Sequence, residues 1–497
     1  MRRLLPILAL ASAGCAQAVE VESACGTVSA ADRETPWDDP IELLDRYDGP
    51  SFSELGELKV HGEQVWFCTG VIGLNTYTAT DPRNLVKADS LAFSAGSASY
   101  PRCDHLAIDP ETSTAYVTSL ATTIQPQSFL AVVDGSDPTN LVELAAITLD
   151  DEVEGLAIAG DLLLVAAHDG GLTVWRRGVG ADIERIGRTA GDVNAWDVTP
   201  GPGDLAYVAD PGGALHTVDL TDPTSPVLVH RLDLPGAPKD FAPDLARDRL
   251  FVAAGSGGVL VIDVSDPRAP VLRDVGDTPG SVVAVAYSPD EDVVAAADWS
   301  SVRVFEADGM VHVGHEPLPS GAGNHSRTLG VAIDGDVVYS GNWTELVSYR
   351  VDASRTAPDA EVSPSIVLLP DTAGGERAQD FVRVVNRGTE TLEIRGVDVG
   401  SSALSFDLEA GPLRAGDDVQ GRLEFAPSSG AALSSWIDLL TDDPDQPRQC
   451  VPVRANQTGT SVGDLVDDAS FLTLENETFR LSDLRGAPVL LAYFATF

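Results

Sequence analysis

The sequence predicts an all-β protein: a seven-bladed β-propeller followed by a β-sandwich. A motif of apolar strand, Asp-Pro pair and second apolar strand recurs along the N-terminal part of the chain. The 497 residues include 46 Gly and 32 Pro, a content typical of turn-rich β structure. No long stretch repeats its apolar residues with the period of a helix.

The repeated motif predicts the blades. The Asp of each pair suits a turn because its side chain can hydrogen-bond the local backbone, while Pro fixes φ at the next position. The Asp-Pro pairs at 81, 137, 222 and 266 are spaced by 56, 85 and 44 residues, and the interval of 85 corresponds to two periods of about 42, a typical blade length. Four clear copies are LNTYTATDPRNLV from Leu74, LAVVDGSDPTNLV from Leu130, LHTVDLTDPTSPVLV from Leu215 and LVIDVSDPRAPVL from Leu260. Three weaker copies bring the count to seven: GGLTVWRRG from Gly170, SSVRVFEADG from Ser300 and ELVSYRVDAS from Glu345.

Further strands precede each copy. Two apolar strands come before the motif in each unit. LFVAAGSGG from Leu250 is an example of the strand directly before it, and EGLAIAG from Glu154 is an example of the strand before that. Units of three or four short strands cannot bury a face singly, but they can when packed around an axis. We therefore expect a propeller over residues 50–354, with 19–49 as an N-terminal linker. A β-helix or stacked solenoid is the alternative, disfavoured because the copies are long and number seven.

The strand and turn of LVIDVSDPRAP resemble the LVIVD repeat of bacterial surface and secreted proteins. The resemblance covers most of residues 50–354 and is weakest in the third, sixth and seventh copies. It implies a seven-bladed propeller and no particular chemistry.

Polar side chains recur once per blade in the loops that lead into the innermost strands. Side chains at matched positions of a ring converge, so we expect a mixed-charge channel mouth that binds a cation, a sugar or a peptide. The alternative is that these loops are polar because they are exposed, with the periodicity following from the repeat. The candidate residues are Asp104, His105, Glu152, Glu154, Asp192, Asn194, Lys239, Asp240, His325 and Arg327.

His312 and His315 have an HxxH spacing, but the surrounding MVHVGHEPLP is typical of strand and loop. A period of two puts positions i and i+3 on opposite faces of a strand, so we expect both histidines to be structural. No nucleophile elbow, phosphate loop or EF-hand pattern is convincing. We therefore expect no catalytic residue, metal or cofactor within these residues.

The chain is strongly acidic: 76 Asp and Glu against 32 Lys and Arg give a formal net charge of −44. Nucleic acid is an unsuitable partner, because phosphate binding needs a concentrated basic surface. The charge instead suits a soluble surface facing a saline or Ca²⁺-rich exterior.

Residues 1–18 are typical of an export signal, since two arginines precede an apolar run too short to span a membrane. SAGC, ending at Cys15, resembles a bacterial lipobox, which implies lipidation of Cys15. The alternative is ordinary cleavage after Ala18. In an exported protein the remaining four cysteines suggest disulfides, and we expect Cys68 to pair with Cys103 because they lie in adjacent repeat units.

Residues 355–364 form a polar, Pro-containing linker. Beyond it, residues 365–457 alternate short strands with turns such as NRG and DDP, a pattern that predicts a β-sandwich. NRGTETLEI, FAP and DDPDQP in this segment resemble the ASH-like immunoglobulin modules of bacterial cell-surface proteins. The resemblance implies an immunoglobulin-like spacer or adhesion module.

Residues 462–497, VGDLVDDASFLTLENETFRLSDLRGAPVLLAYFATF, resemble the opening of a thioredoxin-like redoxin domain of the thiol-oxidoreductase and peroxiredoxin type. The resemblance implies an incomplete thioredoxin-fold segment, because in that family the attacking cysteine would come next. We expect a truncated reading, through a frameshift, an incomplete sequence or a selenocysteine UGA taken as stop. The alternative is a real terminus whose segment is disordered or paired onto a neighbour.

Taken together, these features predict an exported, lipid-anchored protein of the outer membrane, cell surface or periplasm. We expect a protein or small-ligand partner at the propeller face, and contact with a membrane only through the anchor. The alternative is an envelope thiol or selenol oxidoreductase or peroxidase for which the propeller is a targeting module.

Overall fold

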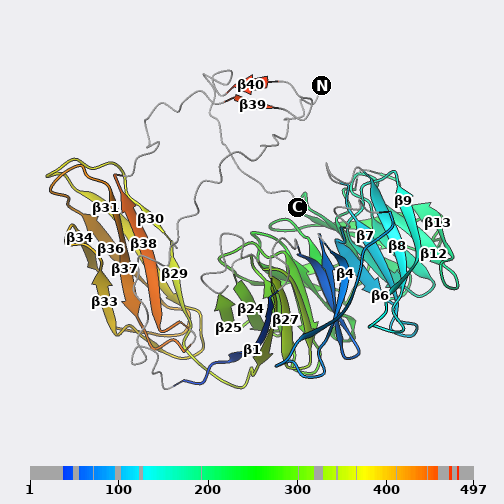
Figure 1. Ribbon diagram of the computed structural model, residues 1–497, viewed down its shortest axis with the longest axis horizontal. Coiled ribbons are helices and arrows are strands. Elements are labelled where there is room, and N and C mark those ends of the chain that lie inside the picture. Colours follow the sequence, from blue (N-terminus) through cyan, green and yellow to red (C-terminus); the bar gives the residue numbers. More distant parts are fainter. Residues whose placement is uncertain are drawn as a thin grey trace.

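The computed structural model is nearly all β structure (Figure 1). It describes residues 37–48, 55–70, 72–95, 102–121, 127–191, 193–299, 301–317, 328–342, 345–364, 366–409, 411–444, 446–456, 470–472 and 478–480. Within these ranges, no helix is both long and apolar enough to cross a membrane.

Seven antiparallel sheets of four strands each form the propeller, as expected. Blade 1 contains β2 (Leu55–His61), β3 (Gln64–Thr69), β4 (Gly73–Thr78) and β5 (Val86–Leu91). Blade 2 contains β6 (His105–Ile108), β7 (Thr114–Ser119), β8 (Ser128–Asp134) and β9 (Val142–Leu149). Blade 3 contains β10 (Leu156–Ala159), β11 (Leu162–Ala166), β12 (Leu172–Arg177) and β13 (Ile183–Arg188). Blade 4 contains β14 (Asp197–Pro200), β15 (Leu205–Asp210), β16 (Ala214–Asp219) and β17 (Val227–Asp233).

The remaining three blades continue the ring. Blade 5 contains β18 (Asp240–Asp244), a turn of 3-10 helix at Leu245–Arg247, β19 (Arg249–Ala253), β20 (Val259–Asp263) and β21 (Val271–Gly276). Blade 6 contains β22 (Ala284–Ser288), β23 (Val293–Ala297), β24 (Ser301–Glu306) and β25 (His312–Pro317). Blade 7 contains β26 (Thr328–Asp334), β27 (Val337–Asn342), β28 (Glu345–Val351) and β1 (Ile41–Asp48). The first strands of neighbouring blades contact one another in a closed circle, with β26 against β2.

The N-terminal strand closes the ring. β1 pairs antiparallel with β28 and so supplies the outer strand of blade 7, where Figure 1 shows it beside the C-terminal strands of the propeller. The expectation that 19–49 is a linker is therefore wrong for residues 41–48. β1 is preceded by an Asp-Pro pair, Asp39-Pro40, whose carboxylate accepts a hydrogen bond from the backbone N–H of Ile41 at 2.8 Å. The repeat pattern missed β1 because the rest of its blade lies at the other end of the propeller sequence.

The hydrophobic core of the propeller lies between blades. Each of seven apolar clusters draws its side chains from two neighbouring blades. The cluster between blades 7 and 1, for example, joins Leu58 and Phe67 to Tyr339 and Leu346. A single blade therefore buries its faces only when both neighbours are in place.

The Asp-Pro turns have one geometry and link consecutive blades. In each of the four clear copies the Asp carboxylate accepts a hydrogen bond from the backbone N–H two residues on, at 3.0 to 3.2 Å. The Pro carbonyl then faces the preceding blade: Pro138 accepts from Thr76 Oγ1 and Pro267 accepts from the Tyr207 hydroxyl. At Gly187 a side chain would meet the carbonyl of Pro223 at 2.2 Å. The repeated dipeptide therefore fixes both the turn and its contact with the preceding blade.

A two-layer β-sandwich follows the propeller (Figure 1). One sheet has the order β29 (Ala360–Ser363), β31 (Ala378–Asn386), β36 (Asp418–Phe425), β34 (Leu404–Asp407). The other has the order β30 (Val367–Leu368), β38 (Arg448–Ala455), β37 (Leu433–Leu440), β33 (Gly396–Val399). Both sheets contribute to one core, for example through Val382 and Leu423 from the first and Ile437 and Val453 from the second. β29 begins inside the segment 355–364 that was expected to be a linker.

Two short strand pairs complete the description. β32 (Leu392–Glu393) pairs with β35 (Pro412–Leu413), and β39 (Ser470–Leu472) pairs with β40 (Thr478–Arg480). The immunoglobulin-like and thioredoxin-like assignments stay predictions. Cys15 and most of residues 462–497 lie outside the described residues.

Candidate functional site

A cavity of about 530 Å³ lies on the propeller axis. Its walls come from the first strands of blades 1 to 5, and its polar lining includes Glu57, Lys59, Asp197 and Asp240. The volume falls within the range of small-ligand sites.

A line of alternating acidic and basic side chains runs along the channel from blade 1 to blade 3. Glu57 and Lys59 are two apart on β2 and form an ion pair. His105, the first residue of β6, lies between two carboxylates: its Nδ1 is 3.6 Å from Glu57 Oε2 and its Nε2 is 3.6 Å from Glu154 Oε1. The other oxygen of Glu154, Oε2, lies 3.5 Å from Nε2 of His168.

Along this line, attraction between neighbouring charges shifts the pKa values more than burial does. Burial by itself would raise the pKa of Glu57 and Glu154, but the adjacent Lys59 and histidines lower the pKa of both carboxyls to about 2. Burial would likewise lower the pKa of His105, but its contacts with Glu154 and Glu57 raise that pKa well above the ordinary value. At neutral pH the line is therefore ionised, with Glu57 and Glu154 as anions and His105 as a cation.

Two further carboxyl groups in the channel show the opposite shift. Asp197 opens β14 and Asp240 opens β18. Burial, together with the charge of Asp240, raises the pKa of Asp197 well above its ordinary value, and burial raises the pKa of Asp240. Lys59 acts on both groups but is already paired with Glu57. These two carboxyls therefore lack a full countercharge.

Another group of polar side chains adjoins the line. Asp104 accepts hydrogen bonds from Arg102 Nε at 2.6 Å and from the backbone N–H of Leu120 at 2.8 Å. Lys239 Nζ lies 5.1 Å from the ring centroid of Trp196, and the His168 ring meets the same indole edge-on at 5.3 Å. The half-buried Trp196 thus already holds one cation against its face.

The structure brings half of the predicted residues to this region. Five of them lie in or beside the channel. His105 and Glu154 belong to the charged line and Asp240 lines the cavity. Lys239 contacts Trp196, and Asp104 directly precedes His105. Asn194 is half-buried, and its Oδ1 accepts no hydrogen bond among the described residues. Glu152 is exposed beside the line. Asp192, His325 and Arg327 lie outside the described residues.

The sequence reasoning missed five members: Glu57, Lys59, His168, Trp196 and Asp197. Glu57 and Lys59 lie within an innermost strand rather than in the loop before it. The i, i+2 spacing of two charged residues in GELKV was the available signal, because one face of such a strand must line the axis.

A family model for the LVIVD repeat matches residues 194–233 and 248–278. The first repeat spans all four strands of blade 4, and the second spans the three outer strands of blade 5. The LVIVD repeats and the seven four-stranded sheets together fit a β-propeller. No curated protein matches the chain.

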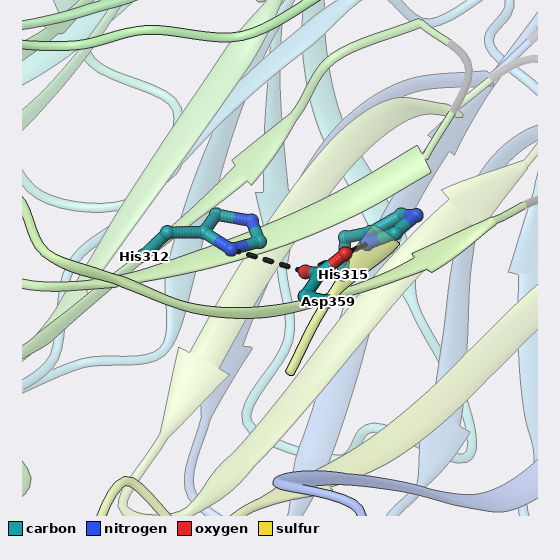
Figure 2. Close-up of side chains that lie close together, drawn as sticks. All are labelled: His312, His315 and Asp359. Atoms are coloured by element: carbon teal, nitrogen blue, oxygen red, sulfur yellow. Dashed lines mark hydrogen bonds and ion pairs between the residues drawn. The ribbon is translucent and has the colours of Figure 1, made fainter. Parts of the chain in front are cut away.

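Two other features lie away from the channel cavity. Cys68 on β3 and Cys103 just before β6 form a disulfide bond that joins blades 1 and 2. In the part of the chain that the structure describes, three metal-ligating side chains come together at one place, formed by His312, His315 and Asp359 (Figure 2).

Proposed function

We propose that this chain is an exported binding protein of the cell envelope whose propeller channel binds a ligand with a cationic group. The observation that carries the proposal is the pair Asp197, which is buried, and Asp240, which is half-buried. Both carboxyls line a ligand-sized cavity, have a raised pKa and lack a full countercharge. A positive group placed between them would let both ionise. The net charge of −44 would also draw cations toward the protein.

The size and character of the cavity narrow the ligand class. A volume of about 530 Å³ suits an amine, an amino sugar or the side chain of a basic peptide rather than a folded domain. An anionic ligand would meet Glu57 and Glu154, which are ionised at neutral pH because of their low pKa values.

Calorimetric titration tests this proposal with a matched pair of probes, a capped tripeptide with a central lysine and the same peptide with norleucine. We expect only the lysine peptide to bind, and we expect its ammonium group to favour the ionised forms of Asp197 and Asp240, so that protons still held by these carboxyls at the assay pH are released. Titration in buffers of different ionisation enthalpy measures that release.

The double variant Asp197→Asn and Asp240→Asn should weaken binding at least about tenfold and abolish the proton release. Asp204→Asn, at an exposed position of blade 4, is the control. Equal binding of the norleucine peptide, or unchanged binding by the double variant, contradicts a cation site in the channel.

Export and anchoring are separate parts of the proposal. They rest on the apolar N-terminal segment and on the lipobox-like SAGC at Cys15. Labelling with a radioactive fatty acid in a bacterial host should mark the wild-type protein and not the Cys15→Ser variant. If the wild-type protein is not labelled, the lipid anchor is refuted and the signal is removed by ordinary cleavage.

A second candidate function is an envelope thiol or selenol oxidoreductase. The pairing of β39 with β40 favours it, because this hairpin lies in the segment whose sequence resembles the start of a redoxin domain. Sequencing the gene beyond the Phe497 codon tests this. In-frame redoxin-like sequence beginning with a cysteine codon or UGA supports the candidate, and an ordinary stop without such sequence removes it.

A further inference from the structure

His312, His315 and Asp359 meet where the propeller joins the sandwich (Figure 2). The two histidines lie on β25 of blade 6, and Asp359 directly precedes β29 of the sandwich. His312 Nδ1 is 3.1 Å from Asp359 Oδ2, and His315 Nδ1 is 2.9 Å from Asp359 Oδ1. The exposed fractions of the three residues are 9%, 7% and 4%.

A bulge explains why two histidines at positions i and i+3 share a face. In the pairing of β24 with β25, Val304 faces Gly314 while Phe305 faces His312, so Val313 is an extra residue. One inserted residue shifts the alternation by one, which returns His315 to the side of His312. The expectation that the two histidines lie on opposite faces is therefore wrong, although the expectation of a strand is confirmed.

The side chains are close, and His315 Nδ1 forms a hydrogen bond with Asp359 Oδ2 at 3.0 Å, but the other contacts within the cluster are poorly aligned. His312 Nδ1 and Asp359 Oδ1 are fully buried, and within the described part of the chain neither makes a hydrogen bond of good geometry despite the short distances above. Buried polar atoms are rarely left in this way. Atoms that bind one metal ion lie about 3 Å from one another while their lone pairs point at the ion rather than at each other.

Negative charge surrounds the cluster. Asp443 is fully buried and accepts a hydrogen bond from the backbone N–H of Ala360 at 2.8 Å. Asp359 and Asp443 are thus two buried carboxyl groups beside two imidazoles, and a cation would offset the cost of burying their charge.

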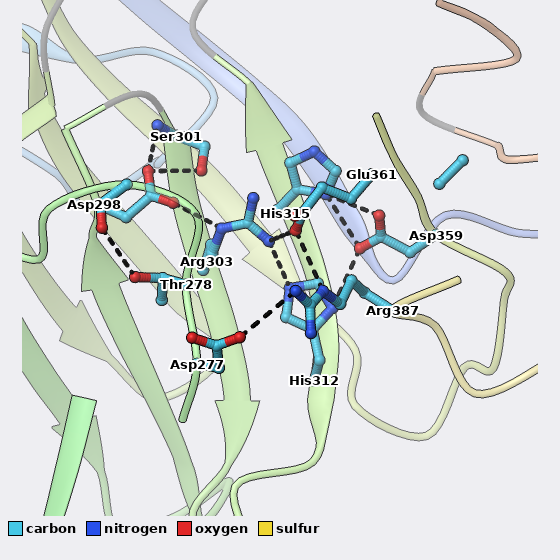
Figure 3. Close-up of polar contacts among 12 residues, drawn as sticks. Asp277, Thr278, Asp298, Ser301, Arg303, His312, His315, Asp359, Glu361 and Arg387 are labelled. Atoms are coloured by element: carbon cyan, nitrogen blue, oxygen red, sulfur yellow. Dashed lines mark hydrogen bonds and ion pairs between the residues drawn. The ribbon is translucent and has the colours of Figure 1, made fainter. Parts of the chain in front are cut away.

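The nearby arginines have other partners (Figure 3). Arg303 Nε donates to Asp298 at 2.6 Å, and its Nη1 lies 3.7 Å from Glu361. Arg387 pairs with the same Glu361 at 3.2 Å and with Asp277 at 3.4 Å. The charges of these arginines are therefore paired with carboxylates outside the His–Asp–His cluster.

We propose that His312, His315 and Asp359 bind a Zn²⁺ ion that joins the propeller to the sandwich. Imidazole nitrogen and carboxylate oxygen are ligands that Zn²⁺ takes in proteins, and a water would complete a four-coordinate site. Binding through Nδ1 requires the proton of His312 to sit on Nε2. Nε2 would then give up the long hydrogen bond, 3.4 Å, that it accepts from Arg303 Nη1.

Metal analysis of the full chain without an affinity tag tests the site. After dialysis against Zn²⁺ and then against metal-free buffer, we expect one ion per chain by mass spectrometry of the metal. His315→Gln and Asp359→Asn should each lower the Zn²⁺ affinity about tenfold or more. His216→Gln is the matched control, because His216 is also buried and lies 3.2 Å from a carboxylate, Asp210, in blade 4. It should keep the full metal content.

A measurement on the wild-type protein covers the case in which the variants fail to fold. Co²⁺ in place of Zn²⁺ should give the strong visible absorption of a four-coordinate ion. Wild-type protein without bound metal overturns the proposal, as does retention of the ion by both His315→Gln and Asp359→Asn. Loss of the ion from a His105→Gln and His168→Gln double variant would place the metal in the channel and would also overturn it.

Discussion

At the scale of single residues, the channel separates its acidic groups into two kinds. Glu57 and Glu154 are anions because basic neighbours lower their pKa to about 2, so they add stability above pH 4.5 that is lost as the pH falls toward 2. Asp197 and Asp240 have a raised pKa because burial disfavours their charge. They cost stability as the pH rises above 3.8, the pKa of an unfolded Asp. A ligand that removes this cost would be bound tightly.

The first prediction follows from Asp197. Replacing it by Asn keeps the shape and removes the charge that burial disfavours. We expect the free energy of unfolding at pH 7 to rise by about 1 kcal/mol or more, since each unit of pKa shift corresponds to about 1.4 kcal/mol. At pH 3 the two proteins should be equally stable, because the carboxyl is then protonated both folded and unfolded. Urea unfolding at several pH values measures the difference.

Asp204→Asn, exposed in the same blade, should change stability by less than about 0.5 kcal/mol at either pH. A pH-independent effect of Asp197→Asn would mean that hydrogen bonding, rather than charge, dominates at this position.

At the scale of elements, the outer strand of blade 7 closes the ring. Ile41 of β1 is 1% exposed and packs in the cluster between blades 6 and 7, which also contains Val304 and Tyr349. Leu43, two residues along, is 44% exposed. β1 therefore contributes both its pairing with β28 and one buried side chain to the closure.

The second prediction concerns this strand. Ile41→Ala should lower the free energy of unfolding by about 3 kcal/mol, the usual cost of removing a buried branched side chain. Leu43→Ala, on the same strand, is the control and should cost less than about 0.5 kcal/mol. Guanidinium unfolding followed by tryptophan fluorescence compares the two. Similar losses for both variants would show that β1 does not pack as an integral part of the propeller.

At the scale of the whole molecule, stability depends on the net charge and on the contacts between the propeller and the sandwich. Trp37, which precedes β1, donates a hydrogen bond to Asp442 of the sandwich at 3.0 Å, and Arg387 of the sandwich reaches Asp277 of the propeller. These contacts tie the two modules together in spite of a net charge of −44, which by itself drives them apart.

The third prediction follows from that net charge. Raising NaCl from 10 mM to 500 mM screens the repulsion, so we expect the melting temperature to rise by roughly 2–4 °C, the shift that about 1 kcal/mol produces in a domain of moderate size. Choline chloride at the same ionic strength should have the same effect if screening is the cause. A response to Na⁺ alone would instead indicate specific cation binding, and a fall with both salts would mean that attractive ion pairs outweigh the repulsion.

The sequence by itself determined the number of blades and the form of their turns. Each Asp-Pro pair acts within four residues, through a side chain that bonds its own backbone, so the signal is local and repeats wherever the motif does. Asp104, His105, Glu154, Lys239 and Asp240 could be predicted as channel residues for the same reason, since their spacing follows the repeat.

Only the tertiary structure decided the features that depend on distant partners. β1 follows an Asp39-Pro40 turn like those of the repeats, but only its pairing with β28, some 300 residues away, makes it part of blade 7. His312 and His315 share a face because of one inserted residue in β25, and Asp359 reaches them from another module. Charge pairing across blades likewise sets the pKa of Glu57 and His105. Such properties belong to the packing of separate elements, which periodicity along one chain cannot encode.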